Sequence, residues 1–167
     1  MPARQLHLRD AAVLARMAWL LIKLEALQHV LPLPALIRRF DARPRPSRRT
    51  VDPNRLVWLA EALLRRLYRS RYCMKRSMLL FYFLRKWTYP VRIHFGIAPN
   101  DNGDALGGHA WVSLDGEPFH EAGPPESTYT TMFSYPPPCE VTRRTASREE
   151  HDSVSPTPAN RPKSLSS

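Results

Sequence analysis

The segment from residue 74 to residue 86 constrains the fold more than any other part of the chain. Its side chains are apolar nearly all round, with an unbroken run of Met78, Leu79, Leu80, Phe81, Tyr82, Phe83 and Leu84. A helix with such a surface is tolerated only when it is packed on several sides. The segment therefore predicts a helix in the middle of a domain, and the 43% hydrophobic content of the 167 residues is enough to cover it with one core.

Two helices are predicted near the N-terminus. Apolar residues with helical spacing follow Asp10, a residue suited to cap a helix, and the pattern ends before Pro32. Pro34 then fits the first turn of a short helix over residues 35–40. Residues 41–50 read as a basic, proline-containing connector, which is either a solvated loop or a contact for an acidic partner.

A third helix is predicted from Asp52 and Pro53, with Asp as the cap and Pro at the first helical position, and it should run to about Tyr68. If Ser70 caps the central helix that follows, Cys73 falls in its first turn. Unpaired backbone N–H groups and the helix dipole favour an anion there, so the position suits a thiolate. A small buried packing role is the commoner use of a cysteine and stays open.

The second half of the chain predicts strands. Residues 91–97 alternate apolar and polar side chains as a half-buried strand does, and residues 99–104 have the composition of a loop. Residues 109–114 form a second strand-like run, followed by a turn at residues 115–116. Residues 129–135 could cover a cleft formed by these elements.

The register of the hairpin after His109 decides which side chains meet. A two-residue loop at Asp115 and Gly116 places His109 opposite Ala122, so that Glu121 points to the other sheet face. A three-residue loop that begins at residue 114 places His109 opposite Glu121, with Cβ atoms about 4.5–5.5 Å apart. We predict the three-residue loop.

This arrangement brings together the parts of a cysteine peptidase. A nucleophilic thiol needs a nearby histidine, and the histidine needs a third group that fixes its tautomer and orientation. Cys73, His109 and Glu121 fill these roles, and Asp115 is the fallback for the third. Backbone N–H groups at the start of the central helix are candidate oxyanion donors.

The same residues carry a family resemblance. Tyr-Cys-Met-Lys-Arg-Ser at 72–77, Leu-Arg-Lys at 84–86, the strand at 91–97 and above all Gly-His-Ala-Trp-Val at 108–112 are similar to the transglutaminase-like leader peptidases of lasso-peptide biosynthesis, often called the B proteins. The resemblance covers roughly residues 10–135.

The resemblance implies a papain-like site that cuts the leader from a ribosomally made precursor peptide. In it Cys73 corresponds to the nucleophile and His109 to the base, whereas the acid of the family is usually aspartate and this chain offers Glu121. It also implies a separate small leader-recognition protein, because no strand-rich domain precedes the helices, and a downstream cyclase.

These observations predict an α+β fold in which the central helix packs on a small antiparallel sheet, as in a transglutaminase or papain core. We expect three parts: N-terminal helices and connector over residues 1–50, a catalytic core over 51–135, and a disordered tail rich in Pro and Ser over 136–167.

The formal charge of +10 keeps a second class of function open. A non-catalytic basic module could bind peptide or, less favoured, nucleic acid through its arginine-rich helices. Acyl transfer to an amine is a third interpretation, because it shares the acyl-enzyme with hydrolysis.

Neither a secretory signal nor a membrane span is predicted, because charged residues interrupt the N-terminal apolar run, and we expect a cytoplasmic protein in which Cys73 and Cys139 are free thiols. A metal site of His94, His109, His120 and Cys139 matches no common zinc spacing, so no metal or other cofactor is expected.

Overall fold

The computed structural model describes residues 8–42, 51–70, 72–99 and 106–137. Within these residues the chain forms helices and an antiparallel sheet, the α+β architecture predicted from the sequence. The elements in chain order are α1 (Leu8–Leu27), α2 (Leu33–Phe40), α3 (Pro53–Leu67), α4 (Cys73–Lys86), β1 (Val91–Pro99), β2 (Leu106–Leu114), β3 (Glu117–Pro118), the 3-10 helix η1 (Pro125–Ser127) and β4 (Thr130–Tyr135).

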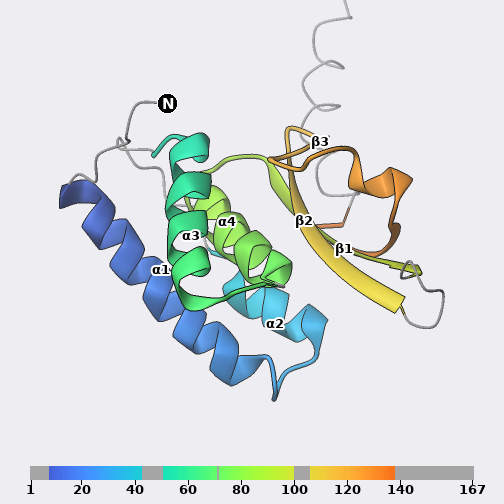
Figure 1. The fold of residues 1–167 in the computed structure, drawn as a ribbon, viewed down its shortest axis with the longest axis horizontal. Helices are drawn as coiled ribbons and strands as arrows, with labels where there is room; N and C mark the ends of the chain where they lie inside the picture. Colours follow the sequence, from blue (N-terminus) through green and yellow to red (C-terminus); the bar gives the residue numbers. More distant parts are fainter. Residues whose placement is uncertain (1–7, 43–50, 71, 100–105, 138–167) are drawn as a thin grey trace, which may run out of the picture. The chain divides into compact units, whose positions relative to one another are not determined.

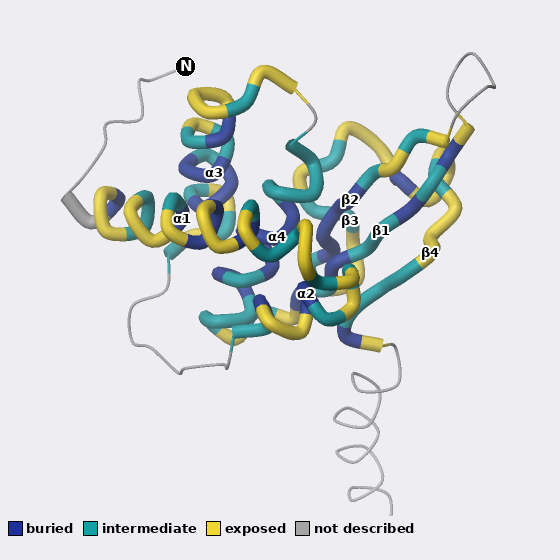
Figure 2. Tube along the Cα trace, turned by 90° about the horizontal axis from the view of Figure 1, so that it is seen from below, coloured by how far each residue is buried: buried dark blue, intermediate teal, exposed yellow. Residues whose placement is uncertain are grey.

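Helix α4 is packed on two sides, as its apolar surface predicts. It lies between the helices α1 and α3 on one side and the sheet on the other (Figure 1). Figure 2 shows which residues this arrangement buries: the outward faces of α1 and α3 are exposed, and α4 is largely covered. The buried residues of α4 are Ser77, Met78, Leu79, Leu80, Phe81, Phe83 and Leu84.

The helix boundaries follow the sequence signals in part. Asp52 caps α3 as predicted, because its Oδ1 accepts a hydrogen bond from the N–H of Asn54 at 3.2 Å. The predicted cap at Asp10 is wrong, since α1 already includes Leu8 and Asp10 instead accepts a 2.6 Å hydrogen bond from Arg55 of α3.

The sheet has the strand order β3-β2-β1-β4, and its neighbouring strands are antiparallel. Strands β1 and β2 pair over their full length, with Ile93 opposite Val112. Both residues belong to the core cluster on the helical side, so their sequence neighbours point to the other face of the sheet. Strand β4 was not predicted as a strand, and it adds to the free edge of β1.

The predicted register of the hairpin is wrong. Leu114 pairs with Glu117, so the loop consists of the two residues Asp115 and Gly116. Both have positive φ, 53° and 91°, as the favoured two-residue hairpin turns require. Aspartate tolerates this conformation, and Asp-Gly is therefore sufficient to close the tighter loop.

The remaining predictions about organisation concern segments that are only partly described. Residues 1–135 form one compact unit, and a second begins at residue 136. Residues 43–50, where the first boundary was predicted, and residues 138–167, which include Cys139, lie outside the described residues. In the described part of the chain, the helices are too short or too polar to cross a membrane.

Candidate active site

Cys73 is the first residue of α4, which confirms its predicted place in the first turn. The residue before the helix is Tyr72 rather than the expected Ser70, and its side chain makes no capping hydrogen bond. The first helical hydrogen bond runs from the N–H of Arg76 to the carbonyl oxygen of Tyr72 at 2.8 Å. The N–H groups of Cys73 and the two residues after it therefore precede the helical ladder and lie beside the thiol.

Cys73 opens into a cavity of about 370 Å³ that is also lined by His109. The thiol comes from α4 and the imidazole from β2, and β4 closes part of the wall. Nearly all other lining groups are apolar or backbone: Leu33, Met74, Phe95, Gly96, Ile97, Gly108, Ala110, Met132 and Phe133. The segment at 129–135 therefore contributes to the cavity, as predicted, but does so as a strand.

His109 and Glu121 are in direct contact. Nε2 of His109 lies 3.0 Å from Oε2 of Glu121, and the two side chains are 21% and 11% exposed. Because an ionised carboxylate only accepts hydrogen bonds, this contact assigns a proton to Nε2. The imidazole also stacks on Trp111 and Tyr129, with ring centroids 5.9 and 5.0 Å away, and these contacts restrict the orientation of its plane.

Glu121 reaches His109 by a different path from the one predicted. The pairing of β3 ends at Pro118, after which the N–H of Phe119 still donates to the carbonyl oxygen of Val112 at 2.9 Å. His120 then adopts a positive φ of 57°, which ends the extended conformation. The carboxylate of Glu121 consequently returns toward β2.

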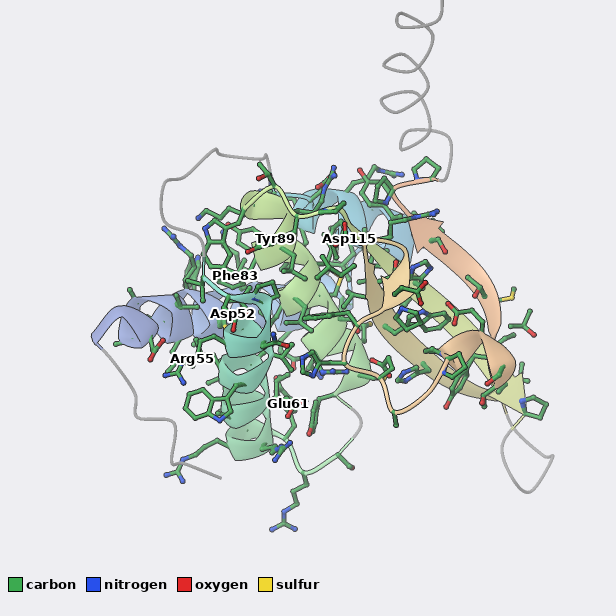
Figure 3. The ribbon with its side chains drawn as sticks, turned by 90° about the horizontal axis from the view of Figure 1, so that it is seen from above. Asp52, Arg55, Glu61, Phe83, Tyr89 and Asp115 are labelled. Carbon is green, nitrogen blue, oxygen red and sulfur yellow. The ribbon has the colours of Figure 1, made fainter. Side chains whose placement is uncertain are left out.

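Arg76 holds the other side of the Glu121 carboxylate, a role that the sequence analysis missed. Its Nη1 donates to Oε1 of Glu121 at 2.8 Å, and its Nη2 donates to the carbonyl oxygen of His120 at 2.6 Å. Oε1 of Glu61, on α3 (Figure 3), lies 3.6 Å from its Nε. Arg76 is one of four cations on α4, with Lys75, Arg85 and Lys86, so the sequence alone does not distinguish it from the others.

Ser77 fixes the position of α4 along β2. Its buried hydroxyl donates a 2.8 Å hydrogen bond to the carbonyl oxygen of Ala110. Ser77 is about one helical turn after Cys73, and Ala110 is the residue after His109. This bond therefore sets the offset between the thiol and the imidazole.

The other histidines near the sheet have different surroundings. The nitrogens of His94 contact the hydroxyls of Ser134 and Ser113, both at 2.8 Å, and its ring stacks on Trp111. Burial, with a smaller contribution from the charge of Arg92, lowers the pKa of His94.

His120 contacts Asn54 through Nε2 at 2.7 Å, on the side of α3. Across the described ranges, no three His, Cys, Asp or Glu side chains are grouped so that they could hold a metal ion.

A thiol at a helix N-terminus and a carboxylate-bound imidazole on an antiparallel sheet, from two residues that line one cavity, are the groups that acyl transfer through a cysteine requires. Residues 12–134 match the model of the transglutaminase-like superfamily, and the chain belongs to that superfamily. No curated protein and no solved structure matches the chain.

Proposed function

We propose that the chain is a cysteine peptidase that removes the leader from a ribosomally synthesised precursor peptide of the lasso type. The observation that carries the proposal is the contact of His109 with Glu121 at the wall of a cavity that Cys73 also lines. This combination supplies a nucleophile, a proton carrier and a group that orients the carrier.

The first half of the reaction forms a thioester. The Cys73 thiolate attacks the carbonyl carbon of the scissile peptide bond, and the resulting oxyanion accepts hydrogen bonds from N–H groups at the start of α4. Because Nε2 of His109 is bound to Glu121, Nδ1 is the nitrogen that exchanges protons at the thiol and the substrate. Imidazolium His109 gives its Nδ1 proton to the departing amine, and the C–N bond breaks.

The second half releases the acid. Neutral His109 takes a proton from a water molecule, the hydroxide attacks the thioester carbonyl, and the carboxylic acid leaves as the Cys73 thiolate and imidazolium are restored. In both halves Glu121 accepts a hydrogen bond from Nε2 and stabilises the imidazolium, without itself taking the proton.

The assignment to leader removal depends on the resemblance at residues 72–77 and 108–112 and on the lining of the cavity. Its apolar walls, from Leu33, Phe95 and Met132 among others, suit a peptide side chain better than a phosphate or a sugar. Within the proposal, a separate leader-recognition protein delivers the precursor, and a cyclase uses the released core.

The test is incubation of the protein with the precursor encoded beside its gene and the candidate recognition protein, followed by mass spectrometry. We expect two products whose masses sum to the precursor plus one water, and no products with Cys73→Ala. Intact precursor with the wild-type protein, or equal cleavage by the variant, contradicts the proposal.

The same experiment distinguishes the other classes of function. A product that carries an added amine in place of water identifies an acyl transferase. Binding of precursor or nucleic acid without any change in mass identifies a non-catalytic basic module.

A further inference from the structure

We propose that Arg76 is the residue that positions Glu121 for catalysis, in place of the strand pairing that the hairpin does not provide. The proposal rests on the proposed peptidase function, because it concerns the third member of the same site. Arg76 touches neither the cavity nor the reacting atoms in this role, and it acts through Glu121.

Both oxygens of the Glu121 carboxylate have a partner in the site. Oε1 accepts from Nη1 of Arg76 at 2.8 Å, and Oε2 lies 3.0 Å from Nε2 of His109. Arg76 and Glu121 each expose only 11% of their side chains, so water competes weakly for these bonds. The carboxylate is therefore held in one orientation between a cation and the imidazole.

Arg76 binds the backbone next to Glu121 as well as the Glu121 side chain. Its Nη2 donates to the carbonyl oxygen of His120 at 2.6 Å, directly before Glu121. His120 has a φ of 57°, a conformation that is uncommon for residues other than glycine. The two contacts of Arg76, to His120 and to Glu121, therefore stabilise both the turn and the position of the carboxylate.

The chemistry of the Arg76 guanidinium suits this role. Its planar fork places two donors at fixed separation, and it stays charged throughout the working pH range. Glu61 approaches the Nε edge at 3.6 Å, which leaves both Nη groups for the segment that contains Glu121. Lysine has the charge but lacks the fork, so Arg76→Lys should keep only part of the effect.

The kinetic test compares Arg76→Met and Arg76→Lys with the wild-type protein on the precursor. We expect kcat to fall about 10- to 100-fold in Arg76→Met, with a smaller loss in Arg76→Lys, and KM to change less than about twofold. Combining Arg76→Met with Glu121→Gln should lower kcat little beyond the worse single variant, because both act on one contact.

The matched control is Arg85→Met. Arg85 lies on the same helix, nine residues after Arg76, and makes a comparable ion pair, with Asp41 at 2.9 Å. It should lower the melting temperature as Arg76→Met does while leaving kcat close to that of the wild type. Equal kcat losses in the two variants overturn the proposal.

A second readout needs no peptide substrate. The rate of Cys73 alkylation by iodoacetamide is measured as a function of pH. The pH at which the rate rises should be higher in Arg76→Met, Arg76→Lys and Glu121→Gln than in the wild type. In Arg85→Met it should equal that of the wild type. If the alkylation profile shifts in these variants but the wild-type protein cleaves no precursor, the positioning role is supported and the proposed function is contradicted. An unchanged profile in folded Arg76→Lys and Arg76→Met overturns the positioning role.

Discussion

Nε2 of His109 and Oε2 of Glu121 lie 3.0 Å apart although the hairpin that connects them is no longer paired at either residue. The ladder between β2 and β3 contains only Ser113 with Pro118 and Leu114 with Glu117. Proline has no N–H group and suits the edge of a sheet, where β3 ends. The contact is therefore a tertiary one, made by side chains after the chain has left the sheet.

Replacing Glu121 with glutamine should lower kcat/KM about 10- to 100-fold, because the imidazolium loses its charged hydrogen-bond partner while the side chain keeps its size. Steady-state cleavage of the precursor measures the effect. Glu117→Gln on the exposed part of β3 is the matched control and should cleave normally. Full activity in Glu121→Gln would remove this residue from the mechanism.

Replacing Ser77 with alanine should lower the free energy of unfolding by about 1–3 kcal/mol, because the buried carbonyl of Ala110 loses its donor. Urea denaturation followed by circular dichroism measures the change. Ser127→Ala removes a similar hydroxyl-to-carbonyl bond, to Pro124 at 2.7 Å, but at the surface, and should cost less than about 0.5 kcal/mol. Equal losses would contradict a structural role for the helix–strand bond.

The stability of the fold should depend on pH through His94. Burial, and secondarily the charge of Arg92, lowers the pKa of His94 in the folded state, so the unfolded chain binds its proton more readily. The stabilisation is complete above the unfolded pKa of about 6.5 and is lost as the pH falls from there toward the lower folded value.

Urea midpoints measured from neutral to acidic pH test this dependence. His94→Gln should flatten the acid side of the profile, whereas His29→Gln, at an exposed position, should leave its slope unchanged. A wild-type profile that is flat through the same range would contradict the expectation.

Placing a charge on the wall of the cavity should weaken substrate binding. Met132 lines the cavity yet is 64% exposed, so Met132→Asp should fold and should raise KM for the precursor by about tenfold. Thr130→Asp, on the same strand but outside the cavity lining, is the control. Alkylation of Cys73 by iodoacetamide should proceed in both variants, and an unchanged KM in Met132→Asp would exclude the cavity as the substrate site.

The helices were the most predictable part of the fold, for local reasons. The cap at Asp52 and the apolar residues of α4 belong to the helices that they predict, or directly precede them, so the signal is local. Strand β4 was missed as a strand because its partner, β1, is distant in the sequence and the pairing leaves no local pattern.

The candidate site was also predicted only in part. The meeting of His109 with Glu121 was predicted and is confirmed, but the register that was expected to produce it is wrong. The two-residue turn of Asp115 and Gly116, both at positive φ, sets the register, and the turn at His120 then restores the contact. Arg76 could not be assigned from the sequence, because its partner is 45 residues away and nothing local indicates it.

The brevity of β3 also affects how the site should respond to heat. Beyond Phe119, the segment that carries Glu121 is secured chiefly by side chains, whereas Cys73 and His109 belong to α4 and to the long β1–β2 pair. Segments with few backbone hydrogen bonds open locally at a lower free energy than the core around them. We therefore expect a temperature interval below global melting in which Cys73 and His109 remain in place while the carboxylate of Glu121 no longer contacts His109. Activity should then be lost at a lower temperature than the fold.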